Sequence, residues 1–134
     1  MKAGVFYGKE DLRIEDRPVP QVGPGQMLVK IAYVGICGTD VEFYKSGMCP
    51  PFTKLPLILG HENCGVVCEV GEGVTKFKVG DRVLCGPPGH CAEDCTPCKE
   101  GKTNICLHGF PRTAGLGQYD GGYAPYLLIH DVAH

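Results

Sequence analysis

The chain of 134 residues is long enough for one domain with a buried core. Its formal net charge is −2 and its 13 basic residues are scattered, so the sequence predicts neither a nucleic-acid partner nor an anionic membrane partner. No apolar run approaches the roughly 18 residues of a membrane span, and charged residues from Lys9 to Arg13 interrupt the start before a signal peptide could form.

Short strands joined by turns are predicted, because 20 glycines and 11 prolines are spread along the chain. The strand at 28–36 alternates as a half-buried strand does, with Val29, Ile31 and Tyr33 on one face. Such a series of strands indicates a mainly β fold, either a barrel or a sandwich. The predicted strands occupy residues 2–7, 12–16, 28–36, 63–70, 82–85 and 123–129.

A short helix is predicted after the strand at 28–36. Thr39 has the chemistry of a helix N-cap, and the acidic residues Asp40 and Glu42 follow it in the first turn. The helix is expected to run through Tyr44 and to stop before Gly47.

Four cysteines at 91–106 have the spacing C-x3-C-x2-C-x7-C. Four thiolates on a short loop can close a tetrahedral shell around Zn²⁺, which is typical of a structural site. Two disulfides are the alternative. An odd total of nine cysteines and the expected cytoplasmic setting disfavour them. The predicted ligands are Cys91, Cys95, Cys98 and Cys106.

A second set of candidate ligands lies upstream. Cys37 follows the strand at 28–36, and His61 stands next to Glu62. One thiolate, one imidazole and an optional carboxylate are typical of a catalytic zinc site, which keeps a position open. Taken alone, Cys37 fits a buried core thiol and His61 an ordinary polar residue. Adjacent residues of a strand point in opposite directions, so His61 and Glu62 can share one ion only if the backbone turns between them.

The residues around these ligands resemble the zinc-dependent alcohol dehydrogenases of the medium-chain dehydrogenase/reductase family. The resemblance covers nearly the whole chain. It is carried by three motifs in order: Val34-Gly35-Ile36-Cys37-Gly38-Thr39-Asp40; then Gly60-His61-Glu62-x2-Gly65-x5-Gly71-x2-Val74 with Gly80-Asp81-Arg82-Val83; then the cysteine loop.

This resemblance implies that residues 1–134 form a GroES-like, partly open β-barrel with short helices and a zinc-binding cysteine lobe. It implies the catalytic domain of an NAD(P)-linked alcohol dehydrogenase. In that family Zn²⁺ binds the alcohol oxygen as a Lewis acid, and hydride passes to the nicotinamide. Cys37 and His61 match the first two zinc ligands. Glu62 matches a carboxylate that is a ligand in some members, and Thr39 matches the hydroxyl that starts the proton relay.

The sequence departs from the family pattern at two places. Glu42 stands where family relays often have a histidine, so the proton route is expected to use a carboxylate or another path. The first gap in the cysteine lobe is three residues rather than two, and His90 is a weaker candidate in place of Cys91.

No dinucleotide-binding motif is found. The run Gly115–Gly121 has the form G-x-G-x3-G, one residue longer than the fingerprint. The chain is therefore expected to lack a Rossmann domain, to be inactive alone, and to belong to a homo-oligomeric enzyme acting on a small alcohol, with the polyol branch favoured. The alternatives are a non-enzymatic zinc scaffold and a zinc-free quinone-reductase-like relative.

The other cysteines have no ligand pattern. Cys49, Cys64, Cys68 and Cys85 are expected to pack as small apolar side chains. Cys64 and Cys68 are predicted to share one face of their strand.

Overall fold

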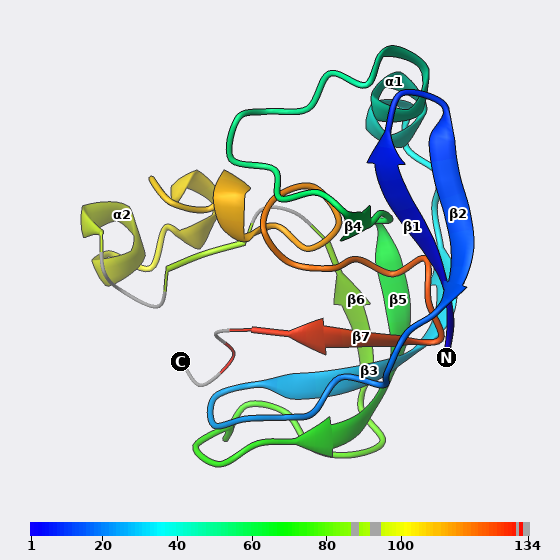
Figure 1. Ribbon diagram of the computed structural model, residues 1–134. Helices are drawn as coiled ribbons and strands as arrows, with labels where there is room; N and C mark the ends of the chain where they lie inside the picture. The colour runs from blue at the N-terminus through cyan, green and yellow to red at the C-terminus, as the bar shows by residue number, and fades with distance from the viewer. Residues whose placement is uncertain (87–88, 92–94, 131, 133–134) are drawn as a thin grey trace.

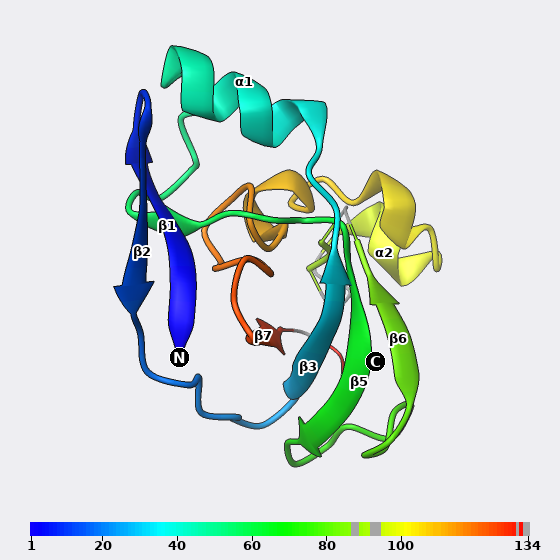
Figure 2. The same cartoon turned by 90° about the vertical axis from the view of Figure 1, so that its right-hand side faces the viewer.

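The computed structural model describes residues 1–86, 89–91, 95–130 and 132 and contains two antiparallel sheets, ordered β2-β1-β4 and β6-β5-β3-β7. The sheets stand on opposite sides of the view in Figure 2. No described strand belongs to both, so the predicted mainly β, partly open architecture is confirmed. The strands are β1 (Lys2–Gly8), β2 (Asp11–Asp16), β3 (Met27–Val34), β4 (Leu57–Ile58), β5 (Asn63–Val70), β6 (Arg82–Cys85) and β7 (Tyr126–Ile129).

The helices are short. Helix α1 (Gly38–Ser46) lies at one end of the sheets, and α2 (Thr96–Lys99) belongs to a lobe that projects to the side (Figure 1). The lobe continues through two 3-10 turns, η1 (Thr103–Ile105) and η2 (Phe110–Arg112).

Helix α1 begins two residues earlier than the sequence predicted, so Thr39 is not its N-cap. Cys37 is the N-cap, with an extended backbone at φ −83° and ψ 156°. Its N–H donates to Oδ2 of Asp40 at 2.9 Å, so the acidic residue closes the first turn. The helix ends at Ser46, before Gly47, as expected.

An apolar cluster holds α1 against the first sheet. Phe43 of α1 and Phe6 of β1 are both buried, and their ring centroids are 6.4 Å apart. Burying two such side chains contributes about 1.5–3 kcal/mol each. Because Cys37 is the N-cap of α1, the apolar cluster that anchors the helix also helps to place Cys37. The buried members of the cluster are Phe6, Phe43, Leu57, Leu59 and Leu116.

Two strand predictions were wrong in detail. The pairing of β3 with β5 shifts register between Ile31 and Tyr33, which breaks the alternation and leaves Tyr33 78% exposed. The last strand starts at Tyr126 rather than Tyr123. The backbone of Tyr123 bonds elsewhere, donating to the Leu59 carbonyl at 2.9 Å and accepting from Gly4 at 2.8 Å.

Cys68 also departs from the prediction, because it is exposed on β5 rather than packed as an apolar side chain. Cys64 and Cys85 are partly buried.

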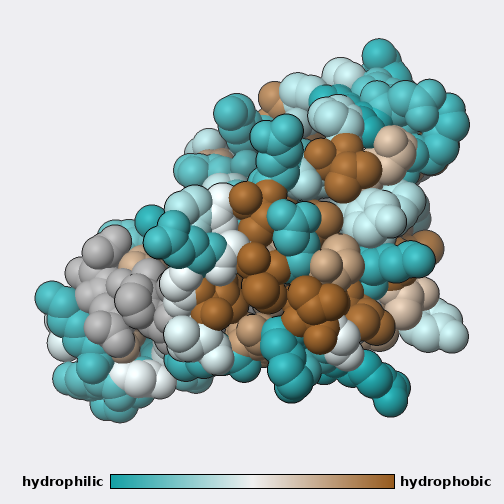
Figure 3. All heavy atoms as spheres, turned by 90° about the horizontal axis from the view of Figure 1, so that it is seen from below, coloured by the Kyte–Doolittle hydropathy of each residue, from teal (hydrophilic) through white to brown (hydrophobic). Residues whose placement is uncertain are grey.

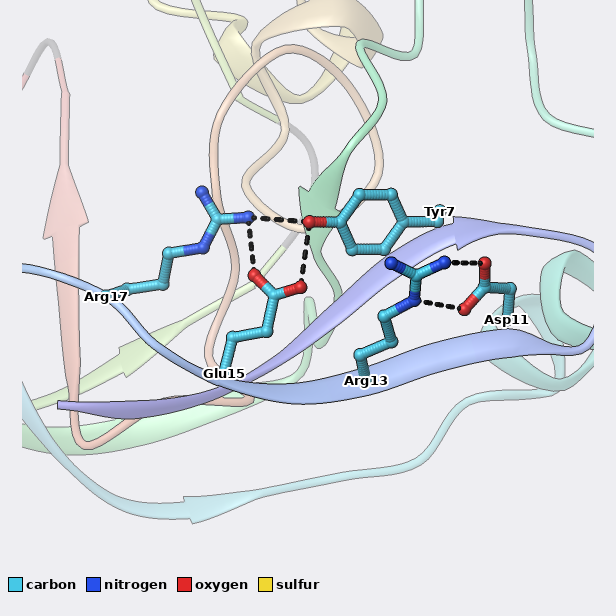
Figure 4. Close-up of polar contacts among 5 residues, drawn as sticks. All are labelled: Tyr7, Asp11, Arg13, Glu15 and Arg17. Carbon is cyan, nitrogen blue, oxygen red and sulfur yellow. Dashed lines mark hydrogen bonds and ion pairs between the residues drawn. The ribbon is translucent and has the colours of Figure 1, made fainter.

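The hairpin of β1 and β2 carries a polar network on its surface (Figure 4). Arg13 makes two 2.7 Å bonds to Asp11 and lies over the ring of Tyr7. The Tyr7 hydroxyl donates to Glu15 at 2.8 Å, and Arg17 pairs with Glu15 at 3.1 Å. Exposed pairs of this kind contribute about 0–1 kcal/mol each, so they adjust the hairpin rather than build it.

The surface seen in Figure 3 carries apolar side chains in its middle and polar ones around them. Within the described part of the chain, no helix has the length and apolar character needed to cross a bilayer.

Candidate metal centres

The four lobe cysteines lie together. One sulfur from each of Cys91, Cys95, Cys98 and Cys106 is within 4.8 Å of the others. The Cys91–Cys95 and Cys95–Cys106 sulfurs are 3.5 and 3.8 Å apart. Neighbouring sulfurs of a tetrahedral zinc site with Zn–S bonds of about 2.3 Å are about 3.8 Å apart. The donor set and its spacing therefore fit Zn²⁺.

The wider first gap does not keep Cys91 out of the cluster. Cys91 is 2% exposed and belongs to the four-sulfur group, whereas His90 does not. Residues 92–94, which lie in this gap, are outside the described part of the chain. The predicted ligand Cys91 is thus placed with the other three.

The lobe thiols face opposing electrostatic effects. The N–H of Cys98 hydrogen-bonds the Cys95 sulfur and lowers the pKa of Cys95 to about 6. Burial raises the pKa of Cys98 to about 12 and also raises the pKa of Cys91. Without a metal, Cys91 and Cys98 therefore keep their protons, and a bound cation would favour their ionised form.

A second cluster forms where β3 ends and β5 begins. Ligand atoms of Cys37, His61 and Glu62 lie within 4.8 Å of one another. Residues 61 and 62 belong to no strand, and Glu62 sits at a bend, so the backbone turns between them. His61 is buried, Cys37 half-buried and Glu62 exposed. One thiolate, one imidazole and one carboxylate fit Zn²⁺ and leave a fourth position open.

Two glycines let these ligands meet. Gly60 has a φ of +91°, and a Cβ there would lie 2.7 Å from the ring of Tyr123. A Cβ at Gly35 would come 2.7 Å from Oε2 of Glu62. A larger residue at position 35 would therefore press on the candidate ligand Glu62, and one at position 60 would press on Tyr123 and Val34, which pack against the turn before His61.

Asp40 supports this cluster and was missed as a site residue. Its Oδ1 lies 3.5 Å from Nδ1 of His61, and both side chains are 4% exposed. A carboxylate facing one ring nitrogen orients the imidazole and leaves Nε2 as the metal-binding atom. The sequence signal was available, because Asp40 stands three residues after Cys37, as in a capping box.

The predicted relay residues lie on α1. The hydroxyl of Thr39 is 3.8 Å from the Cys37 sulfur, beside the second cluster. Glu42 is exposed on the same helix. Residues three apart on a helix are neighbours, so the hydroxyl of Thr39 lies beside the second cluster and the carboxylate of Glu42 lies next to it along α1, toward the surface.

A cavity of about 410 Å³ reaches His61. Asn63, Cys85 and Thr113 also line it, but Cys37 and Glu62 do not. The cavity therefore contacts one candidate ligand only, and we do not assign it as the substrate site.

The chain is similar in sequence to one known domain family and to several dehydrogenases and reductases. The alcohol dehydrogenase GroES-like domain family matches residues 23–133. The chain is 42% identical over 127 residues to a probable D-xylulose reductase A of Arthroderma otae. It is 43% identical over 106 residues to a sorbitol dehydrogenase of Bombyx mori. These matches cover 93% and 78% of this chain but 35% and 30% of the relatives, so the chain spans about a third of their length.

Two solved dehydrogenase structures have the same fold as this chain. An alcohol dehydrogenase from Thermus sp. ATN1 superposes with a TM-score of 0.82 at 32% identity. The 2R,3R-butanediol dehydrogenase from Bacillus subtilis gives 0.79 at 33% identity. Each match covers 98% of this chain and 38% of the other.

Proposed function

The chain belongs to the alcohol dehydrogenase GroES-like domain family, and from this premise we propose that it supplies the zinc-binding catalytic domain of an NAD(P)-linked alcohol or polyol dehydrogenase. The proposed domain covers residues 1–134 and includes a structural zinc lobe at 91–106. The reducing setting of the cytoplasm suits its nine cysteines, all of which are unpaired among the described residues. A homo-oligomeric whole enzyme stays a prediction.

The observation that carries the proposal is the presence of two ligand clusters of different kind. The four lobe cysteines leave no position open, whereas Cys37, His61 and Glu62 supply three donors of mixed type. Structural zinc sites are closed, and catalytic ones keep an open position. A scaffold that used only the lobe would have no need for the second cluster.

We assign each residue of the second cluster a role. Zn²⁺ bound there would supply Lewis-acid chemistry toward an alcohol oxygen. Cys37, His61 and Glu62 are the proposed ligands, and Asp40 holds the imidazole of His61 in the tautomer that binds through Nε2. The hydroxyl of Thr39, which can accept and donate a proton, is proposed to receive the substrate proton.

The substrate class that we propose is a small polyol. The relatives with the printed names D-xylulose reductase and sorbitol dehydrogenase are 42% and 43% identical to this chain. NAD(P) is proposed as the hydride acceptor on the family's account, with its binding site outside these 134 residues.

Metal analysis of the purified chain tests this assignment. We expect two Zn²⁺ per chain, of which a chelator removes one readily and the other slowly. His61→Ala should lose the readily removed ion and keep the other. His108→Ala, a histidine outside both clusters, is the matched control and should keep both.

A chain that holds one ion, with His61→Ala unchanged from the parent, would contradict the catalytic assignment and favour the scaffold. A chain with no zinc and with its thiols paired as disulfides would contradict the lobe as well.

A further inference from the structure

Three buried polar atoms gather beside the second cluster without hydrogen-bond partners. They are Oδ1 of Asp40, Nδ1 of His61 and the hydroxyl oxygen of Tyr123. Leaving a buried polar group unpaired costs about 1–3 kcal/mol. Native proteins pair nearly all such atoms, and Oδ1 of Asp40 already lies 3.5 Å from Nδ1 of His61, so we expect these three atoms to hydrogen-bond with one another.

Tyr123 reaches this place from a distant part of the chain and is firmly held there. Its N–H donates to the Leu59 carbonyl at 2.9 Å, and its carbonyl accepts from Gly4 at 2.8 Å. Its ring packs against Gly60, directly before His61, at a distance that no side chain at residue 60 would permit. The phenol can therefore move little, and its hydroxyl stays next to the site.

The charged groups that act on the Tyr123 hydroxyl are Asp40 and the candidate ligands Cys37 and Glu62. Burial raises the pKa of Tyr123, and the Asp40 carboxylate raises it further, with smaller effects from Cys37 and Glu62. The phenol thus keeps its proton. The Tyr123 hydroxyl faces the Asp40 carboxylate, which can accept a hydrogen bond from it, although the two groups do not meet hydrogen-bond geometry in this structure.

We propose that Tyr123 is a positioning residue of the second cluster, Cys37, His61 and Glu62, which we call the mixed-donor site. The Tyr123 hydroxyl donates a hydrogen bond to Oδ1 of Asp40 and so fixes the carboxylate that orients His61. The inference rests on the proposed function, because it takes Cys37, His61 and Glu62 as metal ligands. Asp40 is then held at both oxygens, since Oδ2 already accepts from the Cys37 N–H at 2.9 Å.

The consequence is a tighter and better-ordered site. An imidazole fixed through its far nitrogen binds a metal more strongly than a mobile one, and loss of such outer partners typically costs about 10–100-fold in metal affinity. Tyr123 acts one step further out than Asp40, so its hydroxyl should account for the lower end, about tenfold.

The test is a Co²⁺ titration of the whole 134-residue chain with its lobe first filled by one equivalent of Zn²⁺. The visible absorption of thiolate-bound Co²⁺ reports occupancy and geometry at Cys37. Tyr123→Phe keeps the packed ring and removes only the hydroxyl. We expect its Co²⁺ dissociation constant to rise about tenfold, with shifted absorption bands and an unchanged unfolding midpoint before Co²⁺ is added.

Tyr7→Phe is the matched control, because it also removes a phenol–carboxylate hydrogen bond, at the β1–β2 hairpin (Figure 4). It should bind Co²⁺ as the parent does. On an Asp40→Asn background, Tyr123→Phe should add less than its effect alone, which is the signature of two residues acting through one contact.

Outcomes separate the two proposals. Parent-like affinity and spectrum in Tyr123→Phe would overturn the role of Tyr123 and leave the metal site standing. A parent chain that takes up no Co²⁺ at Cys37 would overturn both. If Asp40→Asn does not fold, the Tyr123→Phe and Tyr7→Phe titrations still decide the matter.

Discussion

The cysteine lobe and the mixed-donor site differ in how the chain builds them. The lobe takes all four candidate ligands from sixteen consecutive residues, 91–106. The other site joins the end of β3, the bend at 61–62 and the supporting residue Asp40. The first is a local structure, whereas the second exists only after distant segments have packed.

The two regions also rest on different cores. The lobe's buried cluster consists of the sulfurs themselves, Cys91, Cys95 and Cys98, with Cys106 against them. The mixed-donor site is backed by the apolar cluster around Phe6 and Phe43. From this difference we expect that bound metal would hold the lobe together, whereas the folded sheet would hold the second site ready for metal.

The largest effect is expected from Cys98→Ser. It removes one of four thiolates from a lobe that has little other core, and structural zinc contributes about 10–16 kcal/mol of binding free energy in small zinc domains. We expect loss of the tightly held zinc and rapid proteolysis within 95–112. Elemental analysis and limited proteolysis measure both.

Cys68→Ser is the control for this change, because Cys68 is exposed on β5 and belongs to neither cluster. It should keep its zinc and its resistance to protease. A Cys98→Ser chain as resistant as the Cys68→Ser chain would show that the lobe does not need its metal.

A smaller loss is expected from Gly60→Ala, which tests the packed side of the comparison. Gly60 and Gly73 both have a φ above +80°, so alanine at either position is strained by about 1–2 kcal/mol. Only at Gly60 would the new Cβ also meet the Tyr123 ring, at 2.7 Å. We expect Gly60→Ala to cost about 2–4 kcal/mol in urea unfolding, and Gly73→Ala to cost about half as much.

If the two alanine variants unfold alike, Tyr123 does not press on the turn that carries His61. The packing of the Tyr123 ring against Gly60 would then have no part in shaping the mixed-donor site, whereas the assignment of the lobe would be unaffected.

The contrast between local and distant construction also decides what the sequence could reveal. The lobe was predictable because its four ligands stand close together along the chain. The strands at 63–70 and 82–85 were predictable because turn residues bound them, and the structure places them at those residues. These features depend on short stretches of sequence alone.

The mixed-donor site was only partly predictable. Its ligands came from the family resemblance, but the sequence alone could not show that the backbone bends between His61 and Glu62. Nor could it show that Tyr123, 62 residues after His61, returns to the site, because that placement depends on pairing with Leu59 and Gly4. The bulge that exposes Tyr33 is likewise a property of strand pairing.

A pH effect is expected from Cys85, a thiol outside both metal clusters. Burial raises its pKa from 9.0 to about 11, with a smaller contribution from Cys64. Between pH 9 and pH 11 the unfolded thiol ionises while the folded one does not, so ionisation stabilises the unfolded chain and stability falls as pH rises. Since the thiol is only partly buried, we expect a loss of about 1–2 kcal/mol across this window.

Urea unfolding at pH 8.5 and about pH 10.5, compared between the parent and Cys85→Ala, isolates this contribution from that of other groups that titrate in the same range. The variant should lose less stability than the parent. Equal losses would mean that the Cys85 thiol titrates alike in the folded and unfolded chains, so that burial does not raise its pKa. A parent that loses less stability than the variant would mean that the thiol is already ionised in the folded chain, as a metal ligand would be.

The smallest effect on stability is expected from Cys37→Ser, and it completes the comparison with the lobe. The serine hydroxyl keeps the size of the side chain, the N–H bond to Asp40 is a backbone contact, and Phe43 still anchors α1. A polar substitution at a half-buried site with its backbone bonds intact is usually within about 0.5 kcal/mol. The chain should therefore unfold as the parent does while the readily removed metal ion is lost. A Cys37→Ser chain that unfolds early, beside a Cys98→Ser chain that does not, would reverse the two roles and make the mixed-donor site the structural one.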